Sequence, residues 1–154
     1  RTRVPLVHVV EEVKLPLRMV TEKECAEVKA KVDAMKKKGD TSRRLGWHQA
    51  VLDRYKTQKP GSTCDMEMHV IRLGDVAIAT NRFELFTDFG IQMKSRSKAL
   101  QTFVIQLTGP GSYLPTAEAA KGGGYSAIVE SNLVGPKGGQ ILVDRTVEEL
   151  NKLF

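Results

Sequence analysis

Two tyrosines lie near the two ends of one short stretch, Gly111–Tyr125, whose sequence is GSYLPTAEAAKGGGY. Tyr113 stands just before a Pro-Thr pair typical of a helix start, and Tyr125 follows three consecutive glycines. A phenol in a functional site binds a ligand or donates a hydrogen bond, whereas a packed tyrosine buries its ring and bonds its hydroxyl to the backbone. The local sequence leaves both interpretations open.

A carboxylate stands at a second place where chemistry is expected. In DVAIATNRFELF, a buried strand is predicted to deliver Glu84 to the first turn of a helix over Phe83–Ser95. Junctions at the carboxyl ends of strands are where α/β proteins place their sites, and Glu84 is off the apolar face of this helix. The next predicted strand runs into the tyrosine stretch, so we expect Glu84 and Tyr113 to lie close together. The alternative is an acidic side chain that only complements the helix N-terminus.

Other catalytic and metal-binding patterns are absent. His8, His48 and His69 do not pair in sequence with a second His, Cys or carboxylate at a metal-site spacing, so each is interpreted as a solvated or hydrogen-bonded structural histidine. There is no G-x-S-x-G motif, and neither KGGGY nor GPGSY completes a phosphate-binding loop. The hypothesis of a small nucleotide-binding α/β domain is therefore supported by glycine-rich loops alone.

The charge pattern argues against a nucleic-acid partner. The chain has 24 basic and 18 acidic residues, a net charge of +6. Its lysines concentrate in KAKVDAMKKKGD, at the predicted end of a helix, where cations complement the helix dipole. No aromatic residue alternates with them, as a platform for single-stranded nucleic acid requires. We interpret this segment as a solvated helix end rather than a binding patch.

The elements that must position these groups follow from hydrophobic periodicity and turn residues. Thr21 and Glu24 form a predicted capping box at a helix start, and Gly39 ends that helix. The expected order is an extended segment at 2–16, helices at 21–38 and 41–57, strands at 63–74, 75–80 and 100–107 with a helix at 83–95 between the last two, and a closing helix at 140–154. Such alternation predicts an α/β (α+β) fold, a mixed β-sheet flanked by helices in a single domain over 1–154.

Cysteine content and hydropathy add little to this prediction. Cys25 and Cys64 fall on apolar faces and are expected to be buried free thiols, with one disulfide left open. No window approaches the roughly 18 apolar residues of a membrane helix, so no transmembrane segment is expected. No signal peptide is visible in this chain.

Three stretches, in this order and spacing, resemble the end of the catalytic domain of neutral/alkaline (non-lysosomal) ceramidases, most closely the bacterial ceramidase-like branch. They are IRLGDVAIATNRFELFTDFGIQMKSRS, TFVIQLTGPGSYLPTAEAAKGGGY and GGQILVDRTVEEL. The resemblance covers about Arg72 to Phe154. It implies that residues 1–154 are the C-terminal portion of a longer ceramidase-like catalytic domain, that is, a partial catalytic domain.

The resemblance implies a zinc amidohydrolase of sphingolipid metabolism that cleaves the N-acyl bond of ceramide or a related lipid amide. Glu84 and Tyr113 then correspond to zinc ligands, and Tyr125 to the tyrosine that stabilises the oxyanion after zinc-bound hydroxide attacks the amide carbonyl. The glycines before Tyr125 would let the chain fold back so that both phenols face one point. The two histidine ligands of zinc are expected from a region absent from this chain, either the remainder of the catalytic domain or another subunit.

Two further expectations follow. The chain alone is predicted to be inactive, and the resemblance implies a secreted or periplasmic location. The alternative hypothesis is a non-catalytic ceramidase-like domain whose basic surface binds anionic lipid or a protein partner.

Overall fold

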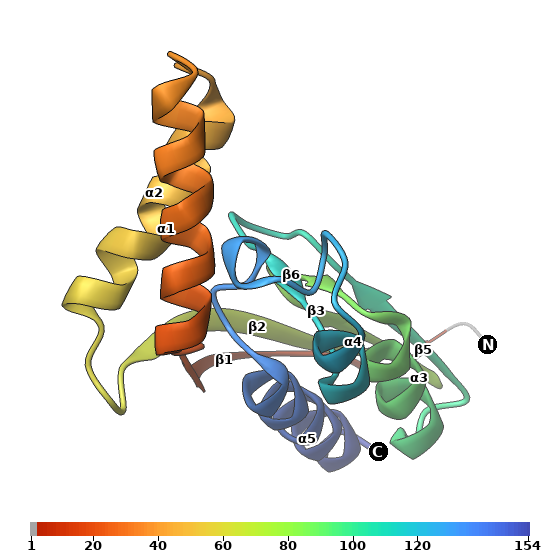
Figure 1. The fold of residues 1–154 in the computed structure, drawn as a ribbon. Coiled ribbons are helices and arrows are strands. Elements are labelled where there is room, and N and C mark those ends of the chain that lie inside the picture. The colour runs from red at the N-terminus through yellow and green to blue at the C-terminus, as the bar shows by residue number, and fades with distance from the viewer. Residues whose placement is uncertain (1–2) are drawn as a thin grey trace.

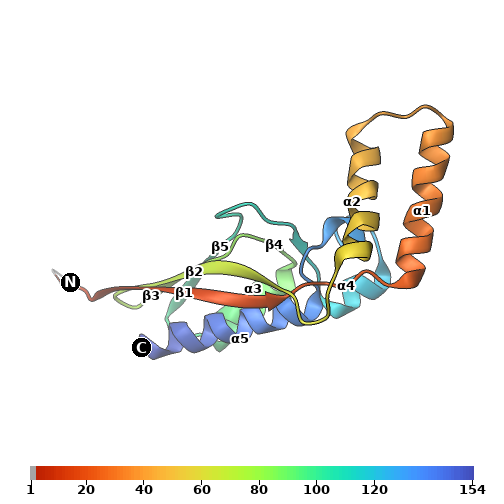
Figure 2. The ribbon, with the colours of Figure 1, turned by 90° about the vertical axis from the view of Figure 1, so that its left-hand side faces the viewer.

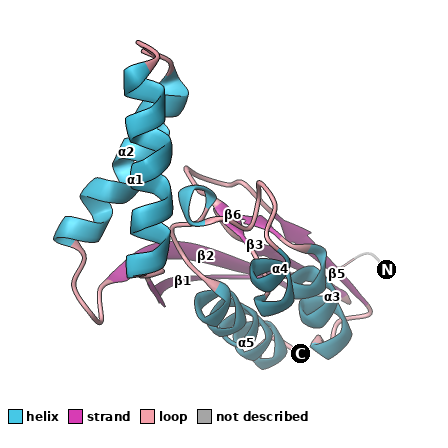
Figure 3. Cartoon of the chain, viewed as in Figure 1, coloured by secondary structure: helices cyan, strands magenta, loops and turns pink. Residues whose placement is uncertain are grey.

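A four-stranded mixed sheet and a two-stranded sheet, combined with helices, make up the fold (Figures 1 and 3). The computed structural model describes residues 3–154. The elements run in the order β1 (Leu6–Pro16), α1 (Glu22–Lys37), α2 (Arg43–Thr57), β2 (Thr63–Leu73), β3 (Val76–Thr80), β4 (Glu84–Leu85), α3 (Thr87–Arg96), β5 (Gln101–Ile105), β6 (Tyr113–Leu114), α4 (Ala117–Gly122), the 3₁₀ helix η1 (Val129–Ser131) and α5 (Pro136–Lys152).

The larger sheet has the strand order β1-β2-β3-β5. β1 pairs with β2 and β2 with β3 in antiparallel fashion, whereas β3 and β5 are parallel and are connected through α3. The smaller sheet consists of β4 and β6, which are also parallel. The prediction of a mixed α/β fold is confirmed.

One face of the large sheet carries the main core. Alternate residues of β2 point into it, and Met66, Met68 and Val70 are at most 1% exposed. α3 and α5 are the helices that pack on the sheet within residues 3–154, and Figure 2 shows α5 running along its lower face. The predicted alternation of β2 is therefore confirmed, because a half-buried strand places every second side chain in the core.

Among the described residues, no helix covers the opposite face of the sheet, which exposes several apolar side chains among polar ones. β5 was expected to be a buried strand, but it is an edge strand with Phe103 49% and Ile105 44% exposed. On β1, Leu6 and Val10 are also exposed on this side. The flanking helices expected on the sheet thus cover one face only, since α1 and α2 stand away from it (Figure 2).

The helices α1 and α2 form an antiparallel hairpin with a small core of its own. Thr21 caps α1, and the predicted capping box with Glu24 is confirmed by both of its hydrogen bonds. Val28 and Val32 pack with α2 and η1 in a cluster separate from the main core. The second helix begins at Arg43, slightly later than predicted.

The structure corrects the predicted start of two helices. Glu84 does not lie in the first turn of a helix; it opens β4, and α3 begins only at Thr87. The backbone N–H groups of Glu84 and Phe86 donate to Ser112 O and Leu114 O, so strand pairing replaces a helical turn here. The closing helix begins at Pro136, earlier than predicted, because proline suits the first helical position.

Two composition-based predictions concern thiols and membranes. Cys25 and Cys64 are free thiols of intermediate burial, so their burial is less complete than expected. Within residues 3–154, no helix combines the length and the apolar character needed to cross a bilayer.

Candidate functional site

The short sheet of β4 and β6 brings Glu84 and Tyr113 together. The two residues are direct partners in the parallel register, followed by Leu85 and Leu114. Side chains of paired residues on neighbouring strands lie on the same face of a sheet and are within contact distance. The predicted proximity of Glu84 and Tyr113 is therefore confirmed, although it arises from strand pairing instead of from a helix start.

Gly111 permits the close approach of these two segments. A Cβ placed at this position would lie 1.8 Å from the carbonyl oxygen of Arg82. Only glycine fits such a contact with backbone, which cannot move aside as a flexible side chain does. The Arg82 guanidinium also donates a hydrogen bond to Pro110 O and thus ties the loop to the start of β4. The first glycine of the tyrosine stretch therefore serves packing, not flexibility.

The later glycines reverse the chain after α4 and deliver Tyr125. Gly123 and Gly124 have φ values of +73° and +96°, a region that side chains with a Cβ disfavour. Tyr125 then lies with its ring centroid 5.9 Å from that of Tyr113, in an edge-to-face arrangement. The predicted fold-back is confirmed. Tyr125 is 66% exposed, so its ring is not part of the hydrophobic interior.

A small hollow of about 240 Å³ is common to the three predicted site residues. We call Glu84, Tyr113 and Tyr125 the tyrosine site. The residues lining the hollow are Trp47, Glu84, Leu107, Gly111, Ser112, Tyr113, Tyr125, Glu130 and Ser131. The ring of Trp47, from α2, lies 5.7 Å from that of Tyr125 and forms one wall. The α1–α2 hairpin thus contributes to a site whose predicted residues come from the sheet end.

The electrostatics of the tyrosine site link its carboxylate to its first phenol. Glu84, as a hydrogen-bond acceptor and as a negative charge, raises the pKa of the Tyr113 phenol above its usual range. The neighbouring Tyr125 acts in the same direction, and Ser126 acts against it. The negative charge of Glu84 thus favours the protonated form of the Tyr113 phenol.

Asn132 holds the backbone of both tyrosine segments. This residue is 1% exposed, and its amide nitrogen donates to Tyr113 O at 3.1 Å and to Ser126 O at 2.9 Å. Its side-chain oxygen accepts a hydrogen bond from Arg18. One buried amide thus joins β6 to the residue after Tyr125, and so limits the distance between the two phenols.

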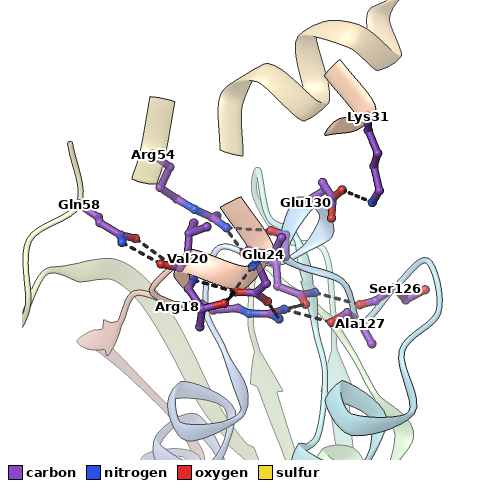
Figure 4. A network of polar contacts seen from close by, with 12 residues as sticks. Arg18, Val20, Glu24, Lys31, Arg54, Gln58, Ser126, Ala127 and Glu130 are labelled. Atoms are coloured by element: carbon purple, nitrogen blue, oxygen red, sulfur yellow. Dashed lines mark hydrogen bonds and ion pairs between the residues drawn. The ribbon is translucent and has the colours of Figure 1, made fainter. Parts of the chain in front are cut away.

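Arg18 and Arg54 extend this connection to the helical hairpin (Figure 4). Arg18 donates to Glu24 Oε1 at 2.8 Å and to Ala127 O at 3.0 Å. Arg54 of α2 donates to the backbone oxygens of Val129 and Asn132. We call Arg18, Glu24, Arg54 and Asn132 the Asn132 network. It fixes the orientation of the hairpin relative to the Tyr125 loop, and hence the place of Trp47.

The three histidines lie outside the tyrosine site. His8 and His69 stack between β1 and β2, with His8 Nε2 2.8 Å from His69 Nδ1, and Glu67 lies 2.9 Å from His69 Nε2. His48 is buried and contacts Glu130. Hydrogen-bonded histidines were expected, but sequence spacing did not reveal the pairing of His8 with His69. In the described part of the chain, no three His, Cys, Asp or Glu residues are arranged to hold a metal.

Comparison of the chain with family models, with curated proteins and with solved structures finds no match. The roles of Glu84, Tyr113 and Tyr125 therefore remain predictions from the resemblance. Trp47, Asn132 and Arg18 were not singled out in the sequence. The one sequence feature that indicates a special position for Trp47 is that it is the only tryptophan. Asn132 and Arg18 offer no comparable indication, because their role depends on contacts with distant segments.

Proposed function

We propose that this chain is part of a zinc-dependent amidohydrolase that cleaves the N-acyl bond of ceramide or of a related lipid amide. The observation that carries the proposal is the convergence of Glu84, Tyr113 and Tyr125 on one small hollow. Strand pairing places the first two side by side, and an edge-to-face ring contact places the third next to them. The ceramidase resemblance requires that these three side chains converge. Tyrosines with only a structural, packing role would not need to converge.

The donor set of the tyrosine site suits a zinc ion in part. Zinc binds carboxylate and nitrogen ligands in a tetrahedral array, and a deprotonated phenol is a further oxygen donor. Glu84 and Tyr113 are paired across the two-stranded sheet, and the negative charge of Glu84, which raises the pKa of Tyr113, would also attract a cation. Zinc held by these two side chains would have two of its four ligands. When bound, zinc would polarise the amide carbonyl and make water a nucleophile at neutral pH.

The residues of the chain would then have distinct tasks. Glu84 and Tyr113 would hold the metal, for which Tyr113 must release its proton. Tyr125, the more exposed phenol, would donate a hydrogen bond to the oxygen of the scissile amide as negative charge develops there. Asn132 would act as a positioning residue, because it sets the separation of the two tyrosine segments.

The remaining two ligands are proposed to be histidines of another segment or subunit. Within residues 3–154, no three His, Cys, Asp or Glu side chains are arranged to hold a metal. Exposed apolar side chains on the uncovered face of the large sheet, among them Val10, Phe103 and Ile105, support a further layer in the active protein. Secretion or export to the periplasm is part of the same proposal.

A second candidate is a non-catalytic domain of the same ancestry that binds anionic lipid or a protein partner. The observation that favours it is the same incomplete ligand set. In this case Glu84 and Tyr113 would only share a hydrogen bond on the surface, and neither zinc content nor hydrolysis would depend on them.

The decisive experiment compares the full-length protein with its double variant Glu84→Ala/Tyr113→Phe. Zinc content is measured by atomic emission, and hydrolysis is measured with a fluorescent N-acyl sphingosine. We expect loss of both zinc and activity in the double variant, whereas Tyr125→Phe should keep zinc and lose about 100-fold in kcat, as for removal of one oxyanion donor. Unchanged zinc and hydrolysis in the double variant would show that Glu84 and Tyr113 are not the zinc site and would favour the non-catalytic alternative for this domain.

The isolated 154-residue chain provides the complementary measurement. Because it supplies two ligands, we expect it to show no zinc-stimulated amide hydrolysis. Hydrolysis by the isolated chain, lost in the Glu84→Ala/Tyr113→Phe variant, would show that no other segment is needed.

A further inference from the structure

A second, larger hollow lies between the helical hairpin and the Tyr125 loop. Its volume is about 750 Å³, and its lining residues are Lys31, Arg43, Arg44, Trp47, His48, Tyr125 and Ile128. Most of the lining is apolar. Trp47 and Tyr125 also line the smaller hollow of the tyrosine site, so the two hollows adjoin. A hollow of this size with an apolar lining and few polar groups is typical of a small-molecule site.

The rim of this hollow is positively charged. Among residues 3–154, no ion pair within 4.0 Å involves Arg43 or Arg44. The nearby carboxylate of Asp40 accepts a hydrogen bond from the Ser42 backbone. This hydrogen bond is the main cause of the lowered pKa of Asp40, and the charge of Arg44 contributes least. Two guanidinium groups therefore remain available for an anionic group, which arginine binds with its planar set of donors.

The third cation, Lys31, is partly neutralised within the protein. Its ammonium group lies 3.0 Å from Glu130, whose side chain is only 2% exposed (Figure 4). Burial raises the pKa of Glu130, but the hydrogen bond from Lys31, a backbone hydrogen bond and the charges of Lys31 and His48 lower it overall. Glu130 thus stays ionised, and the net positive charge of the hollow comes from Arg43 and Arg44.

A buried polar side chain completes the lining. His48 is 4% exposed and lies against the hollow, with Nδ1 3.1 Å from Glu130 Oε1. Because the ionised Glu130 accepts, Nδ1 carries the proton of this pair. The other ring nitrogen, Nε2, makes no hydrogen bond with residues 3–154 and remains for a ligand. Trp47, next to His48, and Ile128 supply apolar surface on which a hydrocarbon chain can lie.

We infer that this hollow binds an amphipathic anion, namely a single alkyl chain that carries a phosphate, sulfate or carboxylate group. The chain lies on Trp47 and Ile128, and the anionic group is held by Arg43 and Arg44. The inference deepens the lipid-binding candidate under the proposed function by naming a site and a ligand class, and it does not depend on zinc. It places a site for a charged amphiphile directly beside the tyrosine site, with Tyr125 between them.

Binding can be measured through Trp47, because it is the only tryptophan in the chain. The probe is dodecyl phosphate, kept below its micelle concentration, and calorimetry provides a second measurement. We expect a saturable change in Trp47 fluorescence. Dodecyl trimethylammonium and inorganic phosphate, which lack the anionic group and the alkyl chain respectively, should each bind at least about tenfold more weakly. Equal binding of either control probe, or no binding of dodecyl phosphate, would overturn the inference.

Matched variants locate the site. Arg43→Gln/Arg44→Gln should weaken dodecyl phosphate binding by roughly tenfold, which is the effect of losing about 1.4 kcal/mol. Lys37→Gln/Lys38→Gln removes the same charge from the end of α1 and should change the affinity less than twofold. Equal weakening by both pairs would show attraction to net charge alone and would overturn the inference. Tyr113→Phe should leave binding intact, which separates this site from the proposed zinc site.

Discussion

The Asn132 network and the tyrosine site are two polar clusters that share a backbone segment but differ in how their polar groups are used. In the network, the buried Asn132 side chain makes three hydrogen bonds, and Arg18 donates to Glu24, Ala127 and Asn132; Arg54 Nε is buried without a partner among residues 3–154. In the tyrosine site, Glu84 and Tyr125 are exposed, and Glu84 raises the pKa of Tyr113.

This difference separates groups that stabilise from groups that are available to a ligand. A buried polar group without a partner costs about 1–3 kcal/mol, so a buried network is retained where its members satisfy one another. Exposed carboxylates and phenols carry no such penalty, and they keep free capacity for a metal or substrate. We therefore expect substitutions in the network to affect mainly stability, and substitutions in the tyrosine site to affect mainly titration and binding.

The largest effect is expected for Asn132→Ala. It removes three hydrogen bonds and leaves Tyr113 O and Ser126 O without this donor, so the free energy of unfolding should fall by about 3 kcal/mol. Urea denaturation followed by circular dichroism measures it. Asn151→Ala is the matched control, since Asn151 also bridges two backbone groups but lies at an exposed helix end; about 1 kcal/mol is expected. Equal losses would contradict the special role of Asn132.

Gly111→Ala should have the next largest effect. Its Cβ would collide with Arg82 O, so the loop must move away from β4, at a cost of about 2 kcal/mol. Because this movement separates β6 from β4, it should also weaken the interaction of Glu84 with Tyr113. Gly46→Ala is the control, because a Cβ there meets nothing within 4 Å and alanine favours the helix; a gain of up to about 1 kcal/mol is expected. A stable Gly111→Ala protein would show that the close approach is not needed.

A pH-dependent effect is expected for Glu130→Gln, with a loss of about 1.5 kcal/mol at neutral pH. The folded-state pKa of Glu130 lies below the ordinary value of 4.5, so its stabilisation is complete above pH 4.5 and is lost as the pH falls through the folded pKa. The difference between wild type and variant, measured by denaturation at several pH values, should therefore shrink below pH 4.5. Glu148→Gln removes an exposed carboxylate of α5 and should show a smaller difference that salt reduces. A difference for Glu130→Gln that does not shrink as the pH falls below 4.5 would contradict this origin.

The smallest effect on stability is expected for Glu84→Gln, below about 0.5 kcal/mol, because Glu84 is exposed. The same change removes the negative charge and the acceptor that raise the pKa of Tyr113, so this pKa should fall toward its ordinary value of 10.0. Ultraviolet titration of tyrosinate measures the shift, and Tyr113→Phe identifies the phenol concerned. An unchanged titration curve would show that Glu84 does not influence the pKa of Tyr113. A large loss of stability would show that Glu84 stabilises the fold, as the Asn132 network does.

Much of the fold could be predicted from short-range pattern. The capping box at Thr21, the alternation in β2 and the chain reversal before Tyr125 depend on residues within a few positions of one another. The start of α3 was predicted wrongly, because the backbone of Glu84 pairs with a strand that lies almost thirty residues later. Local propensity does not include such a partner.

Sequence alone determined which residues of this protein are candidates for chemistry, because residue type and spacing are enough to identify the carboxylate and the two phenols. Tertiary structure alone decided that Asn132 and Arg18 hold the tyrosine segments, and that the helical hairpin brings Trp47 to them. The physical reason is range. Caps, turns and alternation act between neighbours in the chain, whereas a buried amide acquires its partners only when packing brings distant backbone groups within hydrogen-bond distance.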